Sequence, residues 1–233
     1  MMKNLLFSLS WLVIFAFSVS AQEPNTLTAE EKEAGFQLLF DGEKLSPEIW
    51  QDEHSIAGYP VRNGTFVCRK GGNLLTQKEY ADFIFRFEFK LPPAGNNGVG
   101  LRGKSVKDNV SYNGMEIQIL DNSHEKYKDL KPEQYHGSVY GVVASKRNAE
   151  KNDYLKPCGE WNSEEIIAQG TKIKVILNGE TIVDTDIAEF ENKPTPDGQK
   201  HPGLLRKSGF VGFLGHGDPV EFRNVRIKVL GNP

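Results

Sequence analysis

Hydrophobic and polar residues alternate along much of this chain, which is the pattern of β-strands that bury one face. The clearest case is the segment 82–90. There Phe83, Phe85, Phe87 and Phe89 share one face, while the other face carries three charged side chains and one isoleucine. We therefore expect a strand whose phenylalanine face lies in the protein core.

The same reading predicts several more strands along the chain. They are expected at residues 98–102, 115–121, 172–178, 181–184, 209–214 and 220–230, and another begins at residues 160–162. Asn178–Gly179 is a strong hairpin signal, and other turns are rich in glycine. Many short strands joined by such turns favour an all-β sandwich or barrel with antiparallel sheets.

The first residues have the features of a signal peptide. Lys3 precedes an apolar run at residues 5–17, and residues 19–21 (Val-Ser-Ala) fit a cleavage site. The mature chain is then expected to begin at Gln22. The run is short for a membrane span, so an uncleaved anchor is the less favoured alternative. We predict an exported protein, periplasmic or secreted, with no membrane segment after cleavage.

One short helix is predicted before the strands. Thr28 and Glu31 form a capping-box pattern, and Gly35 provides a stop. The expected organisation is a signal peptide at 1–21, an N-terminal helix and linker at 22–34, and a sandwich domain at 35–231. The segment 192–203, rich in Pro, Gly and Lys, is predicted to be a mobile surface loop.

Composition excludes several classes of protein. The 233 residues include 23 Gly, 38% hydrophobic and 25% charged residues, which is typical of a globular chain rather than a disordered one. A net charge of -3 argues against a nucleic-acid binder. Two cysteines are too few for a disulfide-rich scaffold or a cysteine-type zinc cluster. Export permits a disulfide between Cys68 and Cys158, but two separate thiols remain an equal alternative.

Candidate chemistry is concentrated on a few polar residues. Glu116 and Gln118 are two positions apart on one predicted strand and project from the same face. Either the strand is simply half exposed, or this face lines a cleft in which Gln118 binds sugar hydroxyls and Glu116 acts as acid or base. His216 lies between two glycines, which allow close approach of a ligand, and imidazole suits proton transfer.

Other candidates have equally plain structural alternatives. His136 and Tyr140 form one pair, and each is as easily structural as functional. Arg102 can bind a carbonyl or carboxylate group, or it can pair with Glu116 inside the protein. Trp161 can stack on a sugar or belong to the core.

Seven segments, taken in order, resemble one known family. The family is that of the 3-keto-disaccharide hydrolase domain, which is common in exported bacterial proteins. The matching segments are 35–42 (GFQLLFDG), 95–102 (GNNGVGLR), 116–122 (EIQILDN), 137–141 (GSVYG), 159–162 (GEWN), 177–179 (LNG) and 216–225 (HGDPVEFRNV). Cys158 and Gly215 depart from the family's usual residues, and the second departure bears on the polarity beside His216.

The resemblance implies a concanavalin A-like jelly-roll sandwich that acts on glycosides already oxidised to a ketone at C3. It implies Glu116 and His216 as acid and base. Arg102 or a divalent cation would then stabilise an enolate, and the sugar would be bound by Gln118, Asp121, His136, Tyr140 and Trp161. No cofactor is certain, although Asp121 with His216 is a candidate pair of metal ligands.

Two other functions compete with this one. A non-catalytic carbohydrate-binding module would use the same sugar-binding residues without a base. A conventional glycoside hydrolase would need two carboxylates about 5–9.5 Å apart. Glu116 and Asp121 are the plausible partners for that reaction, but their offset places them on opposite faces of a straight strand.

Overall fold

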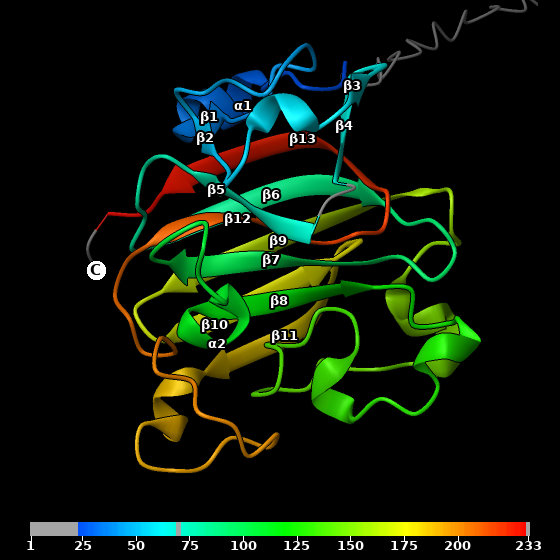
Figure 1. Ribbon diagram of the computed structural model, residues 1–233, viewed down its shortest axis with the longest axis vertical. Helices are drawn as coiled ribbons and strands as arrows, with labels where there is room; N and C mark the ends of the chain where they lie inside the picture. Colours follow the sequence, from blue (N-terminus) through cyan, green and yellow to red (C-terminus); the bar gives the residue numbers. More distant parts are fainter. Residues whose placement is uncertain (1–22, 69–70, 232–233) are drawn as a thin grey trace, which may run out of the picture.

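The computed structural model describes residues 23–68 and 71–231, and it forms two stacked antiparallel sheets (Figure 1). The larger sheet has eight strands in the order β11-β10-β9-β6-β13-β4-β3, with β1 pairing to β13. Its strands are β1 (Phe36–Leu38), β3 (Val61–Arg62), β4 (Thr65–Cys68), β6 (Phe83–Lys90), β9 (Trp161–Gln169), β10 (Lys172–Leu177), β11 (Glu180–Asp186) and β13 (Val220–Val229).

The smaller sheet carries most of the polar candidates. Its five strands follow the order β2-β5-β12-β7-β8. They are β2 (Trp50–Gln51), β5 (Gly71–Thr76), β12 (Phe210–His216), β7 (Asn96–Gly103) and β8 (Met115–Leu120). The two sheets confirm the predicted all-β sandwich, because each predicted strand is present within a few residues of its expected bounds.

Helices are few and short. α1 (Ala29–Glu33) has the predicted capping box: Thr28 accepts from the Glu31 amide, and the Glu31 side chain accepts from the Thr28 amide. A second helix, α2 (Val110–Asn113), was not predicted. Single turns of 3₁₀ helix are η1 (Ile56–Gly58), η2 (Glu125–Tyr127), η3 (Pro132–Gln134), η4 (Ala149–Tyr154) and η5 (Ile187–Phe190). Among residues 23–68 and 71–231, no helix is long and apolar enough to cross a bilayer.

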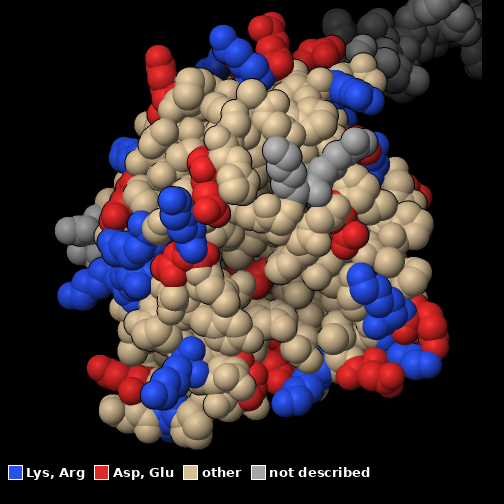
Figure 2. All heavy atoms as spheres, viewed as in Figure 1, with Lys and Arg blue, Asp and Glu red and all other residues tan. Residues whose placement is uncertain are grey.

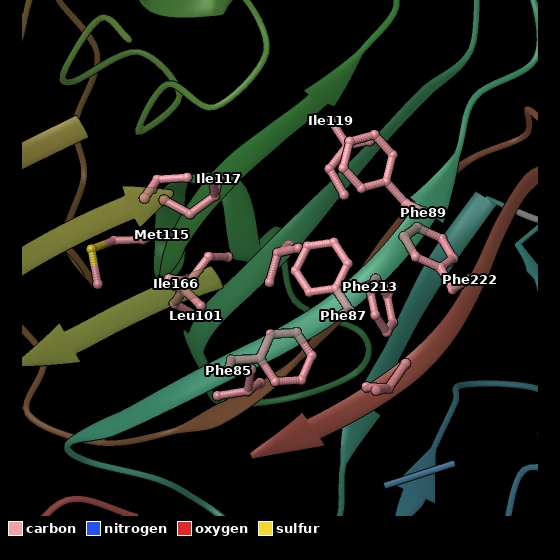
Figure 3. Close-up of a cluster of buried hydrophobic side chains, with 14 of the residues drawn as sticks. Phe85, Phe87, Phe89, Leu101, Met115, Ile117, Ile119, Ile166, Phe213 and Phe222 are labelled. Atoms are coloured by element: carbon pink, nitrogen blue, oxygen red, sulfur yellow. The ribbon is translucent and has the colours of Figure 1, made fainter. Parts of the chain in front are cut away.

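The core between the sheets is built from the predicted phenylalanine stripe. Phe83, Phe85 and Phe89 are fully buried. Phe87 meets Phe213 of the opposite sheet with ring centroids 5.5 Å apart and perpendicular planes, a favourable edge-to-face arrangement. Figure 3 shows Phe85, Phe87, Phe89 and Phe213 together with apolar side chains of β7, β8 and β9. This packing fixes the inner face of both sheets, so the alternate residues of the smaller sheet point outward.

Two segments cover part of the smaller sheet: the α2 segment packs on its outer face, and residues 137–140 lie along β8. A second apolar cluster of Leu75, Val110 and Leu214 packs the α2 segment against this outer face. Beside β8, residues 137–140 run antiparallel to the strand, with Gln118 N donating to Ser138 O at 3.0 Å and Tyr140 N donating to Glu116 O at 2.9 Å. All six residues of β8 are therefore buried, and the reading of β8 as a half-exposed strand is wrong.

Candidate active site

A carboxylate and an imidazole meet on the outer face of the smaller sheet. Glu116 projects from β8 and His216 from the end of β12, and β7 lies between these strands. The distance from His216 Nε2 to Glu116 Oε1 is 3.3 Å, although the residues are 100 positions apart. The fold thus brings together the two residues that the sequence predicted to be catalytic, and we call them the Glu116–His216 pair.

Gly98 makes this meeting possible. It lies on β7, paired with Gln118 of β8 on one side and Leu214 of β12 on the other. A Cβ atom at this position would overlap the carboxylate of Glu116. The glutamate side chain therefore crosses β7 over a residue without a side chain and reaches the imidazole beyond it.

Burial differs sharply between the two partners. The side chain of Glu116 is 3% exposed and that of His216 is 40% exposed. The hydrogen bond to Glu116 raises the pKa of His216. Burial works against this shift, while the charges of Glu116 and Asp218 add to it. The pair thus combines a carboxylate buried in the sheet face with a solvent-facing imidazole whose protonated form is favoured by that carboxylate.

The side of the molecule that carries the smaller sheet is hollowed. Figure 2 shows a depression near the centre of the face that lies over β7 and β8 in Figure 1, with acidic atoms on its floor. Gln118 is on the same face as Glu116, and its Oε1 accepts from the Ile119 amide at 3.1 Å, which leaves the side-chain NH₂ as a donor. Tyr140 is held to the Glu116 carbonyl through its own amide. Gln118 and Tyr140 are therefore placed beside the pair.

Three residues that the sequence did not identify also lie near the pair. The ring of Tyr112 is 6.4 Å from that of Tyr140 and 5.1 Å from that of His201. Burial raises the pKa of Tyr112, and the neighbouring Tyr140, Asp197 and Glu116 add to the shift. His201 Nε2 lies 3.0 Å from Asp197 Oδ2, and only 2% of the His201 side chain is exposed.

These contacts alter the picture of the segment 192–203. It was predicted to be a mobile surface loop, but Asp197 N donates to Gly141 O and Thr195 Oγ1 donates to Asp197 Oδ1. The loop is therefore attached to the segment that carries Tyr140. The same loop lines a hollow of about 520 Å³ through Gly198, Gln199 and Lys200. The other lining residues are Asn109, Tyr112 and Asn113.

Arg102 and His136 are buried and bonded to other groups, and the structure does not join them to the Glu116–His216 pair. Arg102 is 1% exposed and donates to Gly170 O at 2.6 Å, so it neither faces a ligand nor pairs with Glu116. The side chain of His136 is 1% exposed. Its Nε2 lies 3.1 Å from Oε2 of the fully buried Glu164, and its Nδ1 accepts from Leu120 N.

Asp121 and Trp161 also lie apart from the pair. Asp121 accepts from Ala94 N at 2.9 Å and from Ser123 Oγ at 2.6 Å. Burial alone would raise the pKa of Asp121, but these hydrogen bonds outweigh it and hold that pKa below its usual value. Trp161 begins β9 in the larger sheet, so it cannot contact the same sugar ring as the pair on the smaller sheet.

The candidate metal site is not formed by the residues proposed for it. Both oxygens of Asp121 already accept hydrogen bonds, Oδ2 from Ala94 N and Oδ1 from Ser123 Oγ. Within the part of the chain that the structure describes, no group of three or more His, Cys, Asp or Glu side chains could hold a metal ion. The two cysteines are separate thiols, with Cys68 buried and Cys158 exposed.

Comparison with known proteins places the chain in a family. Residues 35–228 match the model of the 3-keto-alpha-glucoside-1,2-lyase-like domain, which spans most of the sequence. The chain belongs to this family. The predicted resemblance is thereby confirmed.

Relatives of known structure or name agree with this assignment. The chain is 24% identical to a 3-keto-disaccharide hydrolase of Bacteroides thetaiotaomicron over 94% of its own length and 86% of that protein. A crystal structure of a candidate glycosyl hydrolase from Parabacteroides distasonis aligns with a TM-score of 0.75 and 25% identity, covering 90% of this chain and all of the other. A second from the same organism gives 0.67 and 29%, covering 84% and 99%.

Proposed function

We propose that this protein is an exported enzyme that cleaves glycosides carrying a ketone at C3. The Glu116–His216 pair on the outer face of the smaller sheet is the observation that carries the proposal, because a binding module needs no such pair. Family membership and the relative named as a 3-keto-disaccharide hydrolase support the substrate class. The apolar segment at residues 5–17 supports export, but it lies outside the described residues.

The reaction follows from the acidity that the ketone gives to the neighbouring carbon. A base removes the proton at C2, and the negative charge is delocalised onto the C3 oxygen as an enolate. The enolate then expels the group at C1: the C1–O bond breaks, a C1=C2 double bond forms, and the leaving oxygen takes a proton from an acid. Water adds across the double bond, with OH at C1 and H at C2, so the net reaction is hydrolysis.

The two members of the pair suit different steps. Glu116 is the base in this scheme, since a carboxylate accepts the C2 proton. His216 is the acid in this scheme, because the hydrogen bond to Glu116 raises its pKa and so favours the protonated imidazole, and its exposure lets it reach the leaving oxygen. Hydrogen-bond donors beside the pair would stabilise the enolate oxygen, and the side-chain NH₂ of Gln118 is our candidate for this role.

The sugar that leaves from C1 also needs a binding site. The hollow beside Tyr112 offers an aromatic wall and the side-chain amides of Asn109, Asn113 and Gln199, which can exchange hydrogen bonds with hydroxyl groups. A sugar leaving group would occupy this hollow while the keto-sugar ring lies over the glycine positions of β7. Both halves of a disaccharide would then contact the same face.

The test uses the protein from residue 22 onward and matched pairs of substrates. Wild-type protein is expected to cleave a 3-keto-glucoside and leave the corresponding unoxidised glucoside intact, with and without chelator. Glu116→Gln and His216→Gln should each lower kcat/KM by about 10²–10⁴, which is the usual contribution of acid–base groups. Glu189→Gln and His54→Gln change exposed residues and are the controls. Turnover of the unoxidised glucoside at an equal rate would contradict the proposal, as would full activity of both variants.

A further inference from the structure

A groove on the larger sheet lies apart from the Glu116–His216 pair. Its volume is about 610 Å³, within the range of roughly 300–1,000 Å³ that is common for ligand sites. An adjoining hollow of about 250 Å³ shares four lining residues with it, which are Lys90, Pro92, Pro219 and Glu221. The two hollows therefore form one extended groove, which we call the Trp161 groove.

Trp161 gives this groove an aromatic surface of fixed orientation. The Arg223 guanidinium lies 4.1 Å from the centroid of the indole ring, and Lys90 Nζ lies 5.0 Å from it. Ion pairs hold both cations in turn: Lys90 Nζ is 2.9 Å from a Glu221 oxygen, and Arg223 Nε is 2.7 Å from Glu88 Oε2. The ring is thus packed in place while it still lines the groove, so little side-chain entropy would be lost on binding.

We propose that the Trp161 groove binds a neutral oligosaccharide at a second, non-catalytic site. The C–H faces of a sugar pack well against an indole ring, and its hydroxyls need both donors and acceptors. Lys90, Arg223 and Glu221 supply charged donors and an acceptor along one strip. Glu221 offsets the charge of Lys90 and Glu88 offsets that of Arg223, which leaves Arg62 as the further positive charge in the lining. A polyanion would need more uncompensated positive charge than this one residue supplies.

The strand pairing argues against an extended peptide as the occupant. A peptide that adds to a sheet needs a strand with an unpaired edge. Two strands below the groove are paired on both sides: β6 lies between β9 and β13, and β13 lies between β6 and β4 (Figure 1). The strand β3 also lines the groove and is an edge strand, but its two residues, Val61 and Arg62, are too few to pair with an extended peptide. Recognition must therefore come from side chains that point outward. A proline-rich peptide on the indole ring is the competing occupant that the experiment tests.

This site would serve a different purpose from the catalytic face. The groove lies on the larger sheet and the Glu116–His216 pair on the smaller one, so a single short saccharide cannot contact both. A glycan chain held in the groove would keep the enzyme close to its polymeric source of substrate. The inference does not depend on the chemistry proposed for the pair.

Tryptophan fluorescence gives a direct reading of the groove. In protein produced from residue 22, Trp50 and Trp161 are the tryptophans present, and Trp50 is 1% exposed in the core. The protein is titrated with neutral oligosaccharides of three to six residues from the maltose, cellulose, xylan, mannan and galactan series. At least one series is expected to shift the emission of the wild type and not that of Trp161→Phe.

Affinity measured by calorimetry then separates the two sites. Trp161→Ala should weaken binding about 10-fold or more, corresponding to about 1.4 kcal/mol, and Glu221→Gln provides a second variant of milder effect on folding. Glu116→Gln should bind as the wild type does. Tyr154→Ala is the matched control, because Tyr154 is also flanked by two lysines but does not line the groove.

Three results would overturn the inference. The first is that no oligosaccharide of the panel binds at millimolar concentration. The second is binding that Trp161→Ala leaves unchanged or that Glu116→Gln abolishes. The third is a proline-rich peptide that binds the groove while the oligosaccharides do not. Each of them leaves the cleavage assay of the keto-glucoside unaffected, so the two proposals fail separately.

Discussion

The carboxylate of Glu116 occupies the space that a side chain on Gly98 would require. Gly98 lies on β7, between the strand that carries Glu116 and the strand that carries His216. Because residue 98 has no Cβ, the carboxylate can lie across the middle strand and approach His216 Nε2 to 3.3 Å. The absence of a side chain at Gly98 thus leaves the space in which Glu116 and His216 meet.

Substitution of this glycine should disable the pair without removing either partner. In Gly98→Ala the new methyl group displaces the Glu116 carboxylate, and a shift of about 1 Å can cost about 10²-fold in rate. We expect kcat/KM on a 3-keto-glucoside to fall by about that factor. Gly71→Ala is the control within the same sheet, because its Cβ would have its nearest neighbour at 3.8 Å, an ordinary contact. Equal effects of the two substitutions, at unchanged thermal stability, would show that the space above residue 98 is unimportant.

The shifted pKa of His216 should be visible in solution. The hydrogen bond to Glu116 raises this pKa above its ordinary value of 6.5. If protonated His216 is the acid, kcat/KM falls as the pH rises through the raised pKa. Glu116→Gln should bring that pKa down towards 6.5, as measured by the pH titration of the ring protons in NMR spectra. The free energy of unfolding should depend on pH in the same direction. The pair contributes its full stabilisation at a pH below the pKa of His216 in the unfolded chain, and this contribution is lost as the pH rises through the pKa of His216 in the folded protein.

A His216 pKa that is identical in the wild type and in Glu116→Gln would contradict the pairing. His54, which is exposed, serves as the internal reference in the same spectra. The comparison does not need turnover, so it tests the geometry even if the substrate class is wrong.

Many of the strands could be predicted because hydrophobic and polar residues alternate along them in the sequence. The stripe from Phe83 to Phe89 identified both the strand β6 and its buried face, and Asn178–Gly179 marked a hairpin that the structure contains. Glu116 and His216 were separate candidates in the sequence, and the fold supplied the contact between them. The strand and hairpin predictions succeeded because each depends on neighbouring residues in the sequence.

Other residues were misjudged because long-range packing decides their role. Arg102 follows a glycine-rich strand and looks available, yet the backbone bulges there with a φ of 58°, and its guanidinium is inserted among carbonyl groups. Trp161 was assigned to the same site as Glu116, and sequence does not show which sheet a strand joins. Tyr112 and His201 were missed because a four-residue helix and an irregular loop carry no periodic signal.

The hollow beside Tyr112 predicts a dependence on the leaving group. Asn109→Ala and Gln199→Ala should lower kcat/KM for a keto-disaccharide, because its leaving sugar loses hydrogen bonds of about 0.5–1.5 kcal/mol each. The same variants should cleave a 3-keto-glucoside of nitrophenol at the wild-type rate, since that leaving group has no hydroxyls to bind. Lys207→Ala, an exposed change outside the hollow, is the control. If the variants lose kcat/KM equally on both substrates, then the leaving sugar does not bind in the hollow beside Tyr112.

The buried contact between His136 and Glu164 should matter for stability rather than for catalysis. Their side chains are 1% and 0% exposed, and Nε2 of the histidine lies 3.1 Å from Oε2 of the glutamate. His136 Nδ1 accepts from Leu120 N, so a neutral ring carries its proton on Nε2, the nitrogen nearest the carboxylate, although the two groups do not meet hydrogen-bond geometry. This contact links β9 of the larger sheet to the chain that runs beside β8.

Removal of one partner would leave the other buried without compensation. We expect His136→Ala to lower the free energy of unfolding by about 3–5 kcal/mol, as measured by urea denaturation, because an unpaired buried carboxylate is costly. Adding Glu164→Gln to that variant should recover part of the loss, since a neutral amide is cheaper to bury. Lys128→Ala breaks an exposed pair with Glu125 and should cost at most about 1 kcal/mol. If His136→Ala costs no more than Lys128→Ala, then the carboxylate of Glu164 finds its stabilisation from other groups and the two sheets do not depend on this link.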